Sequence, residues 1–365
     1  MLTLDNVVHY LVERGFVDAK SVIDGDFLAV DATRRNKNFK IIRRNHPSYF
    51  VKQAQNTDPE APATLHREAT CYWLARARPE LAALRDLMPE YGGYDPARRT
   101  LVLELAPGGE TLAEYYRRVR RFPPEISAQM GALVGNYHKN LVAEIDNPVL
   151  RSVFPQRIPW VLSVHETRPE YYPVLSAGNG QLIELVRRYP EFPQALDKLR
   201  ADWRATSLIH GDMKWENWIV RSASDGGSDA ALKLIDWEMA DLGDPAWDAG
   251  ALLQAYLVFW ILSMPLATET DPARLPGLAQ FPLDPMQPAI RAFWQSYAAA
   301  AELDAARSRD WLLRCVSYGG ARMIQSAFEC LYYEPQMTAQ AVWLLQASQN
   351  ILTKPADALS LLLGL

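Results

Sequence analysis

The residues most able to do chemistry lie in one short segment, LIHGDMKWENWIV. It places His210, Asp212 and Asn217 in the pattern His-x-Asp-x4-Asn, and Asp236 follows nineteen residues after Asn217. Transfer of a phosphoryl group needs a carboxylate that accepts the proton of the acceptor hydroxyl, and oxygen ligands that hold Mg²⁺ on the phosphates. Asp212 suits the first role, and Asn217 with Asp236 suits the second, because Mg²⁺ prefers hard oxygens. The alternative is that these polar side chains only cap turns.

Two short apolar runs must hold these side chains in place. NWIV begins at Asn217, and ALKLIDW ends just after Asp236, with the Gly/Ser/Asp-rich loop SASDGGSD between the runs. Such runs around a polar loop predict a pair of strands. A strand, a turn, a second strand and a further aspartate make a chance match much rarer than the triplet alone.

The chain before these strands divides into a β-rich and a helical part. MLTLDNVVHYLVERGF has the spacing of an amphipathic helix, and TLHREATCYWLARA, from Thr64, predicts another. Four runs predict strands, namely SVIDGDFLAVDA, NFKIIRR, SYFVKQA and RTLVLELA, the last ending in the turn PGGE. We therefore expect an α+β protein of two lobes. Residues 1–106 would form a small antiparallel sheet with helices, and residues 107–365 a mainly helical lobe.

Composition excludes several classes of protein. The formal charge of −5 argues against general nucleic-acid binding, which needs a basic surface. The three cysteines, at positions 71, 315 and 330, lie far apart without CxxC spacing, so we expect neither a disulfide framework nor a zinc site. The N-terminal segment carries Asp5 and Glu13 and lacks the basic start of a signal peptide. We expect a cytoplasmic protein.

One stretch imitates a membrane span. Ala249–Thr268 contains no charged residue, but it includes Gln254 and Pro265. We interpret it as a buried helix that ends near the proline, and we expect no contact with a membrane.

The segments HGDMKWEN, IDWE and GDPAWD resemble the signature of the aminoglycoside phosphotransferase and choline-kinase-like family, whose members have a protein-kinase-like fold. The resemblance implies ATP- and Mg²⁺-dependent transfer of a γ-phosphate to a hydroxyl group. It implies that Asp212 is the catalytic base and that Asn217 and Asp236 are metal ligands. Residues 1–106 would then be the nucleotide-binding lobe, and residues 107–365 would carry the catalytic loop and the acceptor site.

The same resemblance implies roles for three further residues. His210 would organise the catalytic loop, and Asp248, in GDPAWD, would hydrogen-bond that loop and hold its shape. Glu238 matches an acidic position of choline-kinase-like members that approaches a second metal, with a plain surface acid as the alternative.

A kinase also needs a lysine on the third strand, paired with a glutamate of the following helix, to orient the phosphates. Lys52 in YFVKQ and Glu68 in HREATCYWL are the candidates, with Lys40 as a competitor for the lysine. The segment LVLELAPGGE resembles the hinge between lobes, where backbone groups recognise adenine. Glu104 and Ala106 are therefore expected to bind the nucleotide through their backbone.

The expected phosphate-covering loop departs from the protein-kinase pattern. The segment from Asp26 to Ile41 contains no glycine. Backbone amides at positions 34–38, with charge from Arg34, Arg35 and Lys37, are the candidates for holding phosphate. A solvated hairpin is the alternative.

The acceptor is less defined by the sequence. A polycationic aminoglycoside would need an acidic C-terminal region, but after residue 250 there are nine Asp/Glu against seven Lys/Arg. That region is aromatic instead, with Tyr256, Trp260, Trp294, Tyr297, Trp311, Tyr318, Tyr332 and Tyr333. Most of these are expected in the core, and some could line a groove for an extended or apolar acceptor.

A basic segment, YYRRVRRF, is expected on the first helix beyond the hinge. It carries Arg117, Arg118, Arg120 and Arg121, which could dock an acidic partner or simply form a solvated face. The runs IDWEMADLGDPAWDAGALLQAYLVFW and ARMIQSAFE are similar to a branch of the family in class V lanthipeptide and thioamitide biosynthesis. That branch phosphorylates Ser or Thr of a ribosomally made precursor peptide, and a separate lyase then removes the phosphate.

Three hypotheses follow from the sequence. The first, which we favour, is a kinase of peptide Ser/Thr, and the second is a small-molecule kinase acting on an aminoglycoside, an amino alcohol or a sugar. The third is a catalytically silent kinase-like scaffold. The complete set Lys52, Glu68, Asp212, Asn217 and Asp236 argues against the third.

Overall fold

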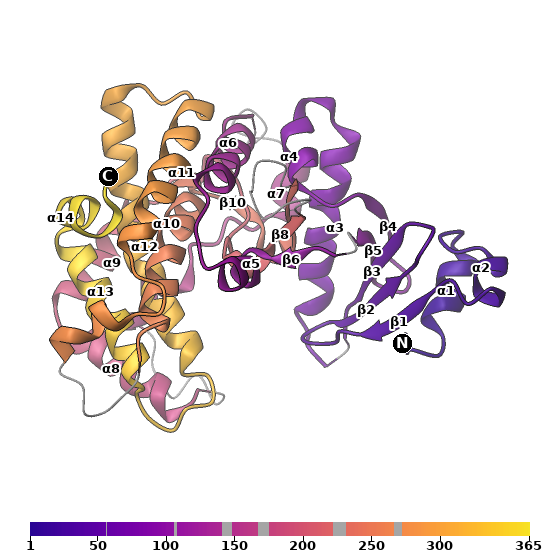
Figure 1. Cartoon of the computed structure of the whole chain (residues 1–365), viewed down its shortest axis with the longest axis horizontal. Coiled ribbons are helices and arrows are strands. Elements are labelled where there is room, and N and C mark those ends of the chain that lie inside the picture. Colours follow the sequence, from indigo (N-terminus) through magenta and orange to yellow (C-terminus); the bar gives the residue numbers. More distant parts are fainter. Residues whose placement is uncertain (56, 106–107, 141–147, 167–174, 222–230, 266–271) are drawn as a thin grey trace.

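The computed structural model describes residues 1–55, 57–105, 108–140, 148–166, 175–221, 231–265 and 272–365. The N-terminal part is built on a five-stranded antiparallel sheet of order β1-β2-β3-β5-β4. Its strands are β1 (Leu28–Asp31), β2 (Lys37–Ile42), β3 (Ser48–Gln53), β4 (Tyr91–Asp95) and β5 (Thr100–Leu105). Figure 1 shows this sheet at one end of the molecule and the C-terminal helices at the other.

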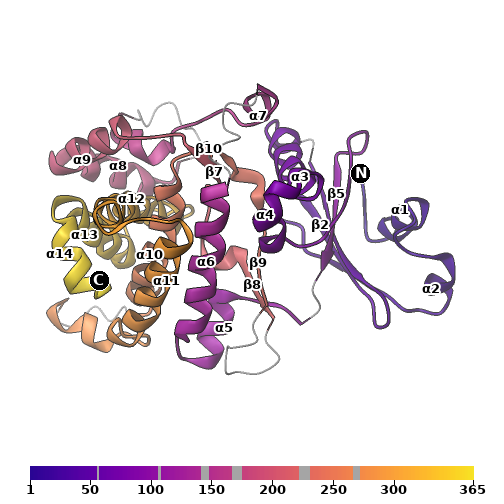
Figure 2. The same cartoon turned by 90° about the horizontal axis from the view of Figure 1, so that it is seen from above.

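Alternation of side chains gives the sheet two covered faces. In β2, Phe39 and Ile41 are buried while Lys40 and Ile42 are exposed. The buried pair packs with α1 (Val7–Glu13), which forms a small separate core with the sheet. The opposite face is covered by the long helix α3 (Ala61–Ala77), and α4 (Ala82–Leu87) packs against α3 (Figure 2). The lysine of β3 and the glutamate of α3 therefore meet on one side of the sheet.

The predicted strand at residues 21–32 is wrong in its first half. Ala19–Ile23 is a short helix, α2, because the Asp18 carboxylate accepts a hydrogen bond from the Ser21 amide and caps it. The strand β1 begins only at Leu28. The strand β4 was not predicted, because glycines such as Gly92 and Gly93 weaken the pattern of a strand. Gly92 is needed there because a Cβ would lie 2.9 Å from the Val102 carbonyl of the neighbouring strand.

The C-terminal part is mainly helical, with two small sheets inserted where the motif residues lie. Strand β7 (Ser207–Ile209) pairs with β10 (Asp241–Gly243), and β6 (Glu110–Thr111), β8 (Trp218–Arg221) and β9 (Ala231–Leu234) form the other sheet. The α-helices around them are α5 (Leu112–Val119), α6 (Pro124–Asn140), α7 (Pro148–Val153), α8 (Ala177–Arg188), α9 (Glu191–Ala201), α10 (Pro245–Leu262), α11 (Gln287–Ala300), α12 (Ala305–Cys330), α13 (Ala339–Thr353) and α14 (Pro355–Ala358). This arrangement confirms the predicted α+β, kinase-like fold class. The predicted lobe boundary stays a prediction, because residues 106–107 lie outside the described residues.

Helix α10 forms the centre of the helical part. It ends at Leu262, three residues before Pro265, which confirms the predicted buried helix up to that point. Among the described residues it is the one helix long and apolar enough to cross a membrane, and 78% of it is buried inside the protein. Its apolar composition is therefore accounted for by the core.

Helices α10 and α12 cross at two glycines. A Cβ on Gly250 would lie 2.3 Å from the Cys315 carbonyl, and one on Gly319 would lie 2.9 Å from the Gly250 carbonyl. The two backbones can approach this closely only because neither residue has a side chain. The crossing also positions Arg322 of α12, whose guanidinium donates a hydrogen bond to the Gly211 carbonyl.

We predict that Gly250→Ala destabilises the protein by about 1–3 kcal/mol, because the helices must move apart. Gly180→Ala in α8 is the matched control, since a Cβ there meets nothing within 4 Å. It should be neutral or stabilise by up to about 1 kcal/mol. Urea unfolding measures both, and equal stability of the two variants would contradict the close crossing.

Candidate active site

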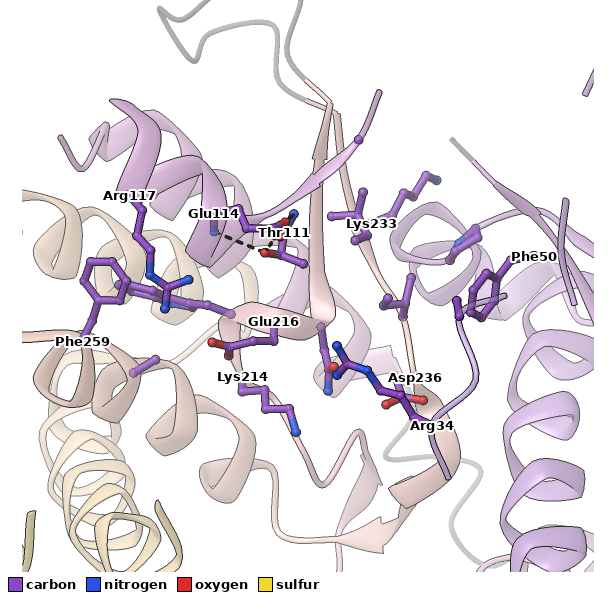
Figure 3. A pocket seen from close by; sticks show the side chains of 18 of the residues that line it. Arg34, Phe50, Thr111, Glu114, Arg117, Lys214, Glu216, Lys233, Asp236 and Phe259 are labelled. Carbon is purple, nitrogen blue, oxygen red and sulfur yellow. Dashed lines mark hydrogen bonds between the residues drawn. The ribbon is translucent and has the colours of Figure 1, made fainter. Parts of the chain in front are cut away.

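A large cavity lies between the N-terminal sheet and the C-terminal helices. Its volume is about 1200 Å³, which exceeds the usual range for a single small-ligand site. Strands β2, β3 and β5 line one end, the segment between β7 and β8 lines the middle, and α10 and α12 line the other end. Figure 3 shows residues of these three regions pointing into the same space.

Lys52 joins three distant segments at the sheet end of the cavity. Its Nζ lies 3.0 and 2.8 Å from the two carboxylate oxygens of Glu68 on α3, and 2.5 Å from Oδ1 of Asp236. The Lys52 and Glu68 side chains are buried, whereas Asp236 is 35% exposed toward the cavity. The predicted pair Lys52–Glu68 is thus brought together, and Lys40 does not contact it.

The two carboxylates determine the charge of this cluster. Burial alone would lower the pKa of Lys52, but Glu68 and Asp236 together raise it. Burial raises the pKa of Glu68, and Lys52 opposes that rise. Burial would also raise the pKa of Asp236, but the nearby Lys52 ammonium lowers it. The cluster therefore keeps a protonated lysine and an ionised Asp236 facing the cavity.

The segment between β7 and β8, which we call the catalytic loop, is organised by His210. The ring is fully buried, and its Nε2 lies 2.9 Å from the Ile235 carbonyl while its Nδ1 lies 3.2 Å from the Asp212 amide. A carbonyl oxygen only accepts, so Nε2 carries the hydrogen and Nδ1 accepts from Asp212. Gly211 follows with φ +80, and a Cβ there would lie 2.5 Å from the Met239 carbonyl. Only glycine fits this turn.

Asp248 holds the catalytic loop through hydrogen bonds to its backbone. This fully buried carboxylate accepts hydrogen bonds from the amides of His210 (2.6 Å) and Gly211 (3.0 Å), and from the Tyr137 hydroxyl (2.7 Å). Burial would raise its pKa, but His138, His210 and Tyr137 lower it. Asp248 also lies in the first turn of α10, where the helix dipole favours negative charge. The expected contact of Asp248 with the loop is present.

Asp212 is surrounded by donors. Lys214 Nζ lies 2.7 Å from its Oδ2, Arg322 Nη2 lies 3.4 Å from its Oδ1, and the Asn217 amide donates to its Oδ2 at 3.3 Å. Burial would raise the pKa of Asp212, but Lys214 and Arg322 lower it to about 2. The carboxylate is therefore ionised throughout the physiological pH range.

Sequence reasoning missed two of these donors. Lys214 was inside the quoted motif, and its position two residues after Asp212 was a usable signal. Arg322 was inside the quoted run ARMIQSAFE, but nothing there indicated its partner, which lies 110 residues earlier in the chain. The guanidinium of Arg322 lies over the Trp247 ring and donates to the Gly211 carbonyl at 3.1 Å, so α12 directly supports the catalytic loop.

Asn217 and Asp236 fit a divalent cation by the chemistry of their donors. The Asn217 amide nitrogen donates to the Asp212 carbonyl at 2.8 Å, which turns its Oδ1 away from that residue. In the part of the chain that the structure describes, no group donates to this oxygen. Both residues line the cavity, so an amide oxygen and an ionised carboxylate are available there. Hard oxygens of this kind suit Mg²⁺.

The remaining nucleotide-binding candidates lie at the edge of the cavity. Glu104 lines it near the end of β5, and its amide already donates to the Glu90 carbonyl at 2.9 Å. Its carbonyl is the backbone group left to consider for a ligand. Ala106 lies outside the described residues.

The arginine-rich segment is not one helical face, contrary to expectation. Helix α5 ends at Val119, and Arg120 caps it in the left-handed conformation with φ 53, so Arg120 and Arg121 follow the helix. Arg118 pairs with Glu110 at 2.6 Å, while Arg117 lies over the Phe259 ring and lines the cavity. Arg120 lies over the Phe281 ring. Arg117 and Arg120 thus lie over neighbouring rings, since the centroids of Phe259 and Phe281 are 4.8 Å apart, whereas Arg118 is engaged by Glu110.

Comparison with known proteins agrees with this geometry. The sequence profile of a family described as "Phosphotransferase enzyme family" matches residues 26–293. Choline kinase from Cryptosporidium parvum Iowa II has a similar structure, with a TM-score of 0.54, 12% identity and coverage of 97% of both chains. A GDP and kanamycin complex of APH(2")-IIia gives a TM-score of 0.55 with 14% identity, covering 95% of this chain and 99% of that one. At these identities the likeness concerns the fold. No curated protein sequence matches significantly.

We predict that Asp248→Asn destabilises the protein by about 2–4 kcal/mol, because an amide cannot accept all the bonds that the carboxylate accepts. Amide hydrogen exchange at His210 and Gly211 should accelerate with it. Tyr137→Phe removes only one of the three donors and should cost about 1 kcal/mol. Unchanged exchange at the two amides in Asp248→Asn would show that Asp248 does not hold the loop.

Proposed function

The chain belongs to the phosphotransferase enzyme family, and we propose that it transfers the γ-phosphate of ATP to a hydroxyl group with the help of Mg²⁺. One observation carries this proposal. Lys52, bonded to both Glu68 and Asp236, faces a cavity whose next wall is the loop that holds Asp212. An oriented ammonium, an ionised carboxylate beside it and a second carboxylate in a buried loop are the parts that phosphoryl transfer requires.

Asn217 and Asp236 would hold Mg²⁺, which neutralises charge on the phosphates when bound. Lys52 then supplies the donor that orients the α- and β-phosphates, and Glu68 keeps that ammonium in one position. Because these contacts come from the sheet, α3 and the end of β9, the nucleotide is held between the two parts of the chain.

Asp212 would position the acceptor hydroxyl and receive its proton. Its low pKa makes it a weak base, which suits a loose transition state in which the proton moves late. Lys214 and Arg322 each contact one of its oxygens, so the carboxylate has a fixed orientation. Lys214 is 41% exposed and lines the cavity, so it can also follow the transferred phosphoryl group.

These contacts argue against a catalytically silent scaffold. Each expected side chain is present, and the Lys52 cluster and the donors around Asp212 are in contact with one another. A scaffold would have no need for an ionised carboxylate in this partly buried position, because taking a charge out of water costs free energy.

For the acceptor we propose a serine or threonine of a ribosomally made precursor peptide. The helical end of the cavity has an apolar wall formed by Val258, Phe259, Leu262 and Phe281. Its charges nearly balance, with Glu216 and Glu329 against Arg117, Lys214 and Arg322. This wall suits a hydroxyl on a chain with apolar neighbours and offers a polycation no excess of negative charge.

An exposed aromatic row supports an extended acceptor. Its members are Trp160, Phe328, Tyr332 and Tyr333, with successive ring centroids 4.8, 6.3 and 5.8 Å apart. Trp160, Tyr332 and Tyr333 are 45%, 52% and 93% exposed. Along the chain the row flanks Glu329 and Cys330, which line the cavity, and a peptide that leaves the cavity on this side would meet the row. Of the arginines predicted to dock an acidic leader, Arg117 and Arg120 would be the candidates, because they lie over the adjoining rings of Phe259 and Phe281, whereas Arg118 is paired with Glu110.

The alternative acceptor is a small hydroxyl compound, such as the choline or kanamycin named for the similar structures. With a peptide acceptor, the phosphorylated product would pass to a separate lyase that removes the phosphate to leave a dehydroamino acid. We place this reaction in the cytoplasm, where thiols stay reduced, since Cys71, Cys315 and Cys330 are all free.

Two variants separate the proposed roles. Asp212→Asn should lower turnover about 10²–10⁴-fold and leave Mg·ATP affinity nearly unchanged, because only the contact to the acceptor proton is lost. Asp236→Ala should instead abolish the dependence of ATP affinity on Mg²⁺. Titration calorimetry with ATP at several Mg²⁺ concentrations, beside ATP hydrolysis rates, measures both. An Asp212→Asn enzyme with normal turnover, or an unchanged Mg²⁺ dependence in Asp236→Ala, would remove that residue from the mechanism.

The acceptor is tested with a panel of peptides and small alcohols. We expect phosphate transfer, seen by mass spectrometry, to a peptide with Ser or Thr among apolar residues, and little transfer to choline or kanamycin. Tyr332→Ala combined with Tyr333→Ala should raise the peptide KM about tenfold, because exposed aromatics are frequent binding hot spots. Efficient transfer to a small alcohol, unaffected by this double variant, would establish the alternative acceptor instead.

A further inference from the structure

The hairpin loop between β1 and β2, residues 32–36, covers the sheet end of the cavity without a glycine. In a glycine-rich loop, free backbone amides surround the phosphates. Here three of the five amides of the loop are already used. The amides of Ala32, Thr33 and Arg34 donate to the Asn38 carbonyl, the Asp31 carboxylate and the Asn36 carbonyl. Fewer amides are thus left for the phosphates, so a cationic side chain of the loop is the stronger candidate for meeting them.

Arg34 is the cation of this loop that faces the cavity. It lines the cavity together with Lys52 and Asp236, and Figure 3 shows its side chain extending into the space beside Asp236. Its side chain has no ion pair among the described residues. Arg35 points elsewhere, since its Nε lies 2.6 Å from Asp58, and Lys37 does not line the cavity.

Glu238 ties this loop to the segment that carries Asp236. Its Oε1 lies 3.3 Å from Arg35 Nη1, and its Oε2 lies 3.3 Å from the side-chain amide nitrogen (Nδ2) of Asn36. The Asn36 side chain is buried. The Glu238 backbone is also held, because its carbonyl accepts from Arg67 of α3. Glu238 is therefore more than a plain surface acid, because it bonds the loop with both of its oxygens.

The loop is braced from its other side as well. Gln55, just after β3, donates to the carbonyls of Arg34 and Arg35 at 3.1 and 3.0 Å. The backbone at Arg34 is therefore held between β3 and Glu238. A side chain that leaves a fixed backbone needs to order only its own rotamers when it binds, which lowers the entropy cost of the contact.

We propose that Arg34 binds the β- and γ-phosphates of the nucleotide directly, and that Glu238, through Arg35 and Asn36, is the positioning residue that holds the loop for this contact. A guanidinium donates two parallel hydrogen bonds to phosphate oxygens, so one arginine replaces several backbone amides. The inference rests on the proposed use of ATP. It assigns phosphate recognition to a side chain where a glycine-rich loop would use the backbone.

The test compares ligands that differ only in phosphate. Isothermal titration with Mg·ATP, Mg·ADP and adenosine is carried out on the full chain and on Arg34→Gln. We expect Arg34→Gln to lower the affinity for Mg·ATP about tenfold, and to lower the affinity for Mg·ADP by a smaller factor. Adenosine should bind equally to both proteins. Lys37→Gln is the matched control, because it removes a cation of the same hairpin that does not face the cavity, and should bind Mg·ATP normally.

The positioning role is tested by a double-mutant cycle. Glu238→Gln and Arg35→Gln should each weaken Mg·ATP binding about threefold, and the loss in the double variant should be smaller than the two losses combined, because the Arg35–Glu238 contact is removed in both single variants. Additive losses would overturn the role of Glu238. Normal Mg·ATP affinity in Arg34→Gln, or an equal loss for adenosine, would overturn the role of Arg34 and leave the proposed function standing. If the unaltered protein binds no Mg·ATP, both proposals fall.

Discussion

One buried ammonium group holds the site together, and most of the structure can be understood as the means of placing it. Lys52 comes from β3, Glu68 from α3 and Asp236 from the end of β9, three segments that only the folded chain brings together. A lysine taken out of water keeps its charge only if carboxylates replace the lost solvation. Two do so here, and one of them faces the cavity. Any relative movement of the sheet and the helical part would leave one of these charges unpaired, so the interaction also fixes how the two parts meet.

In the catalytic loop, too, buried polar groups need partners in place of water. It crosses the core between β7 and β8, where its backbone amides cannot reach water, and Asp248 accepts two of them. The carboxylate is supplied by the first turn of α10, the most buried helix of the helical part. Gly250, two residues further on, lets α12 approach, and α12 carries Arg322 to Asp212. The loop thus depends on the packing of helices that never touch a substrate.

The two ends of the cavity differ in the side chains that they offer to a ligand. At the sheet end, a loop without glycine is braced by Glu238 and Gln55 and leaves Arg34 facing the space for phosphate. At the helical end, an apolar wall with nearly balanced charge gives way to exposed aromatic rings such as Tyr333. The first arrangement suits a ligand of high negative charge and the second an acceptor recognised by shape and apolar contact. This division is what a transfer from a nucleotide to a chain-like alcohol would require.

The motif His210–Asp212–Asn217 with Asp236, and the pair Lys52–Glu68, could be found from the sequence because strand and loop boundaries keep short spacings along the chain. The fold class and the buried α10 followed from hydrophobic patterns for the same reason. Tertiary structure alone decided that Arg322 reaches Asp212, that Glu238 bonds Arg35, and that α5 ends at Val119, before Arg120 and Arg121. These contacts join residues more than a hundred positions apart, or depend on where a helix ends. No local periodicity encodes either, because a long-range pair is determined by the packing of whole elements rather than by neighbours in the chain.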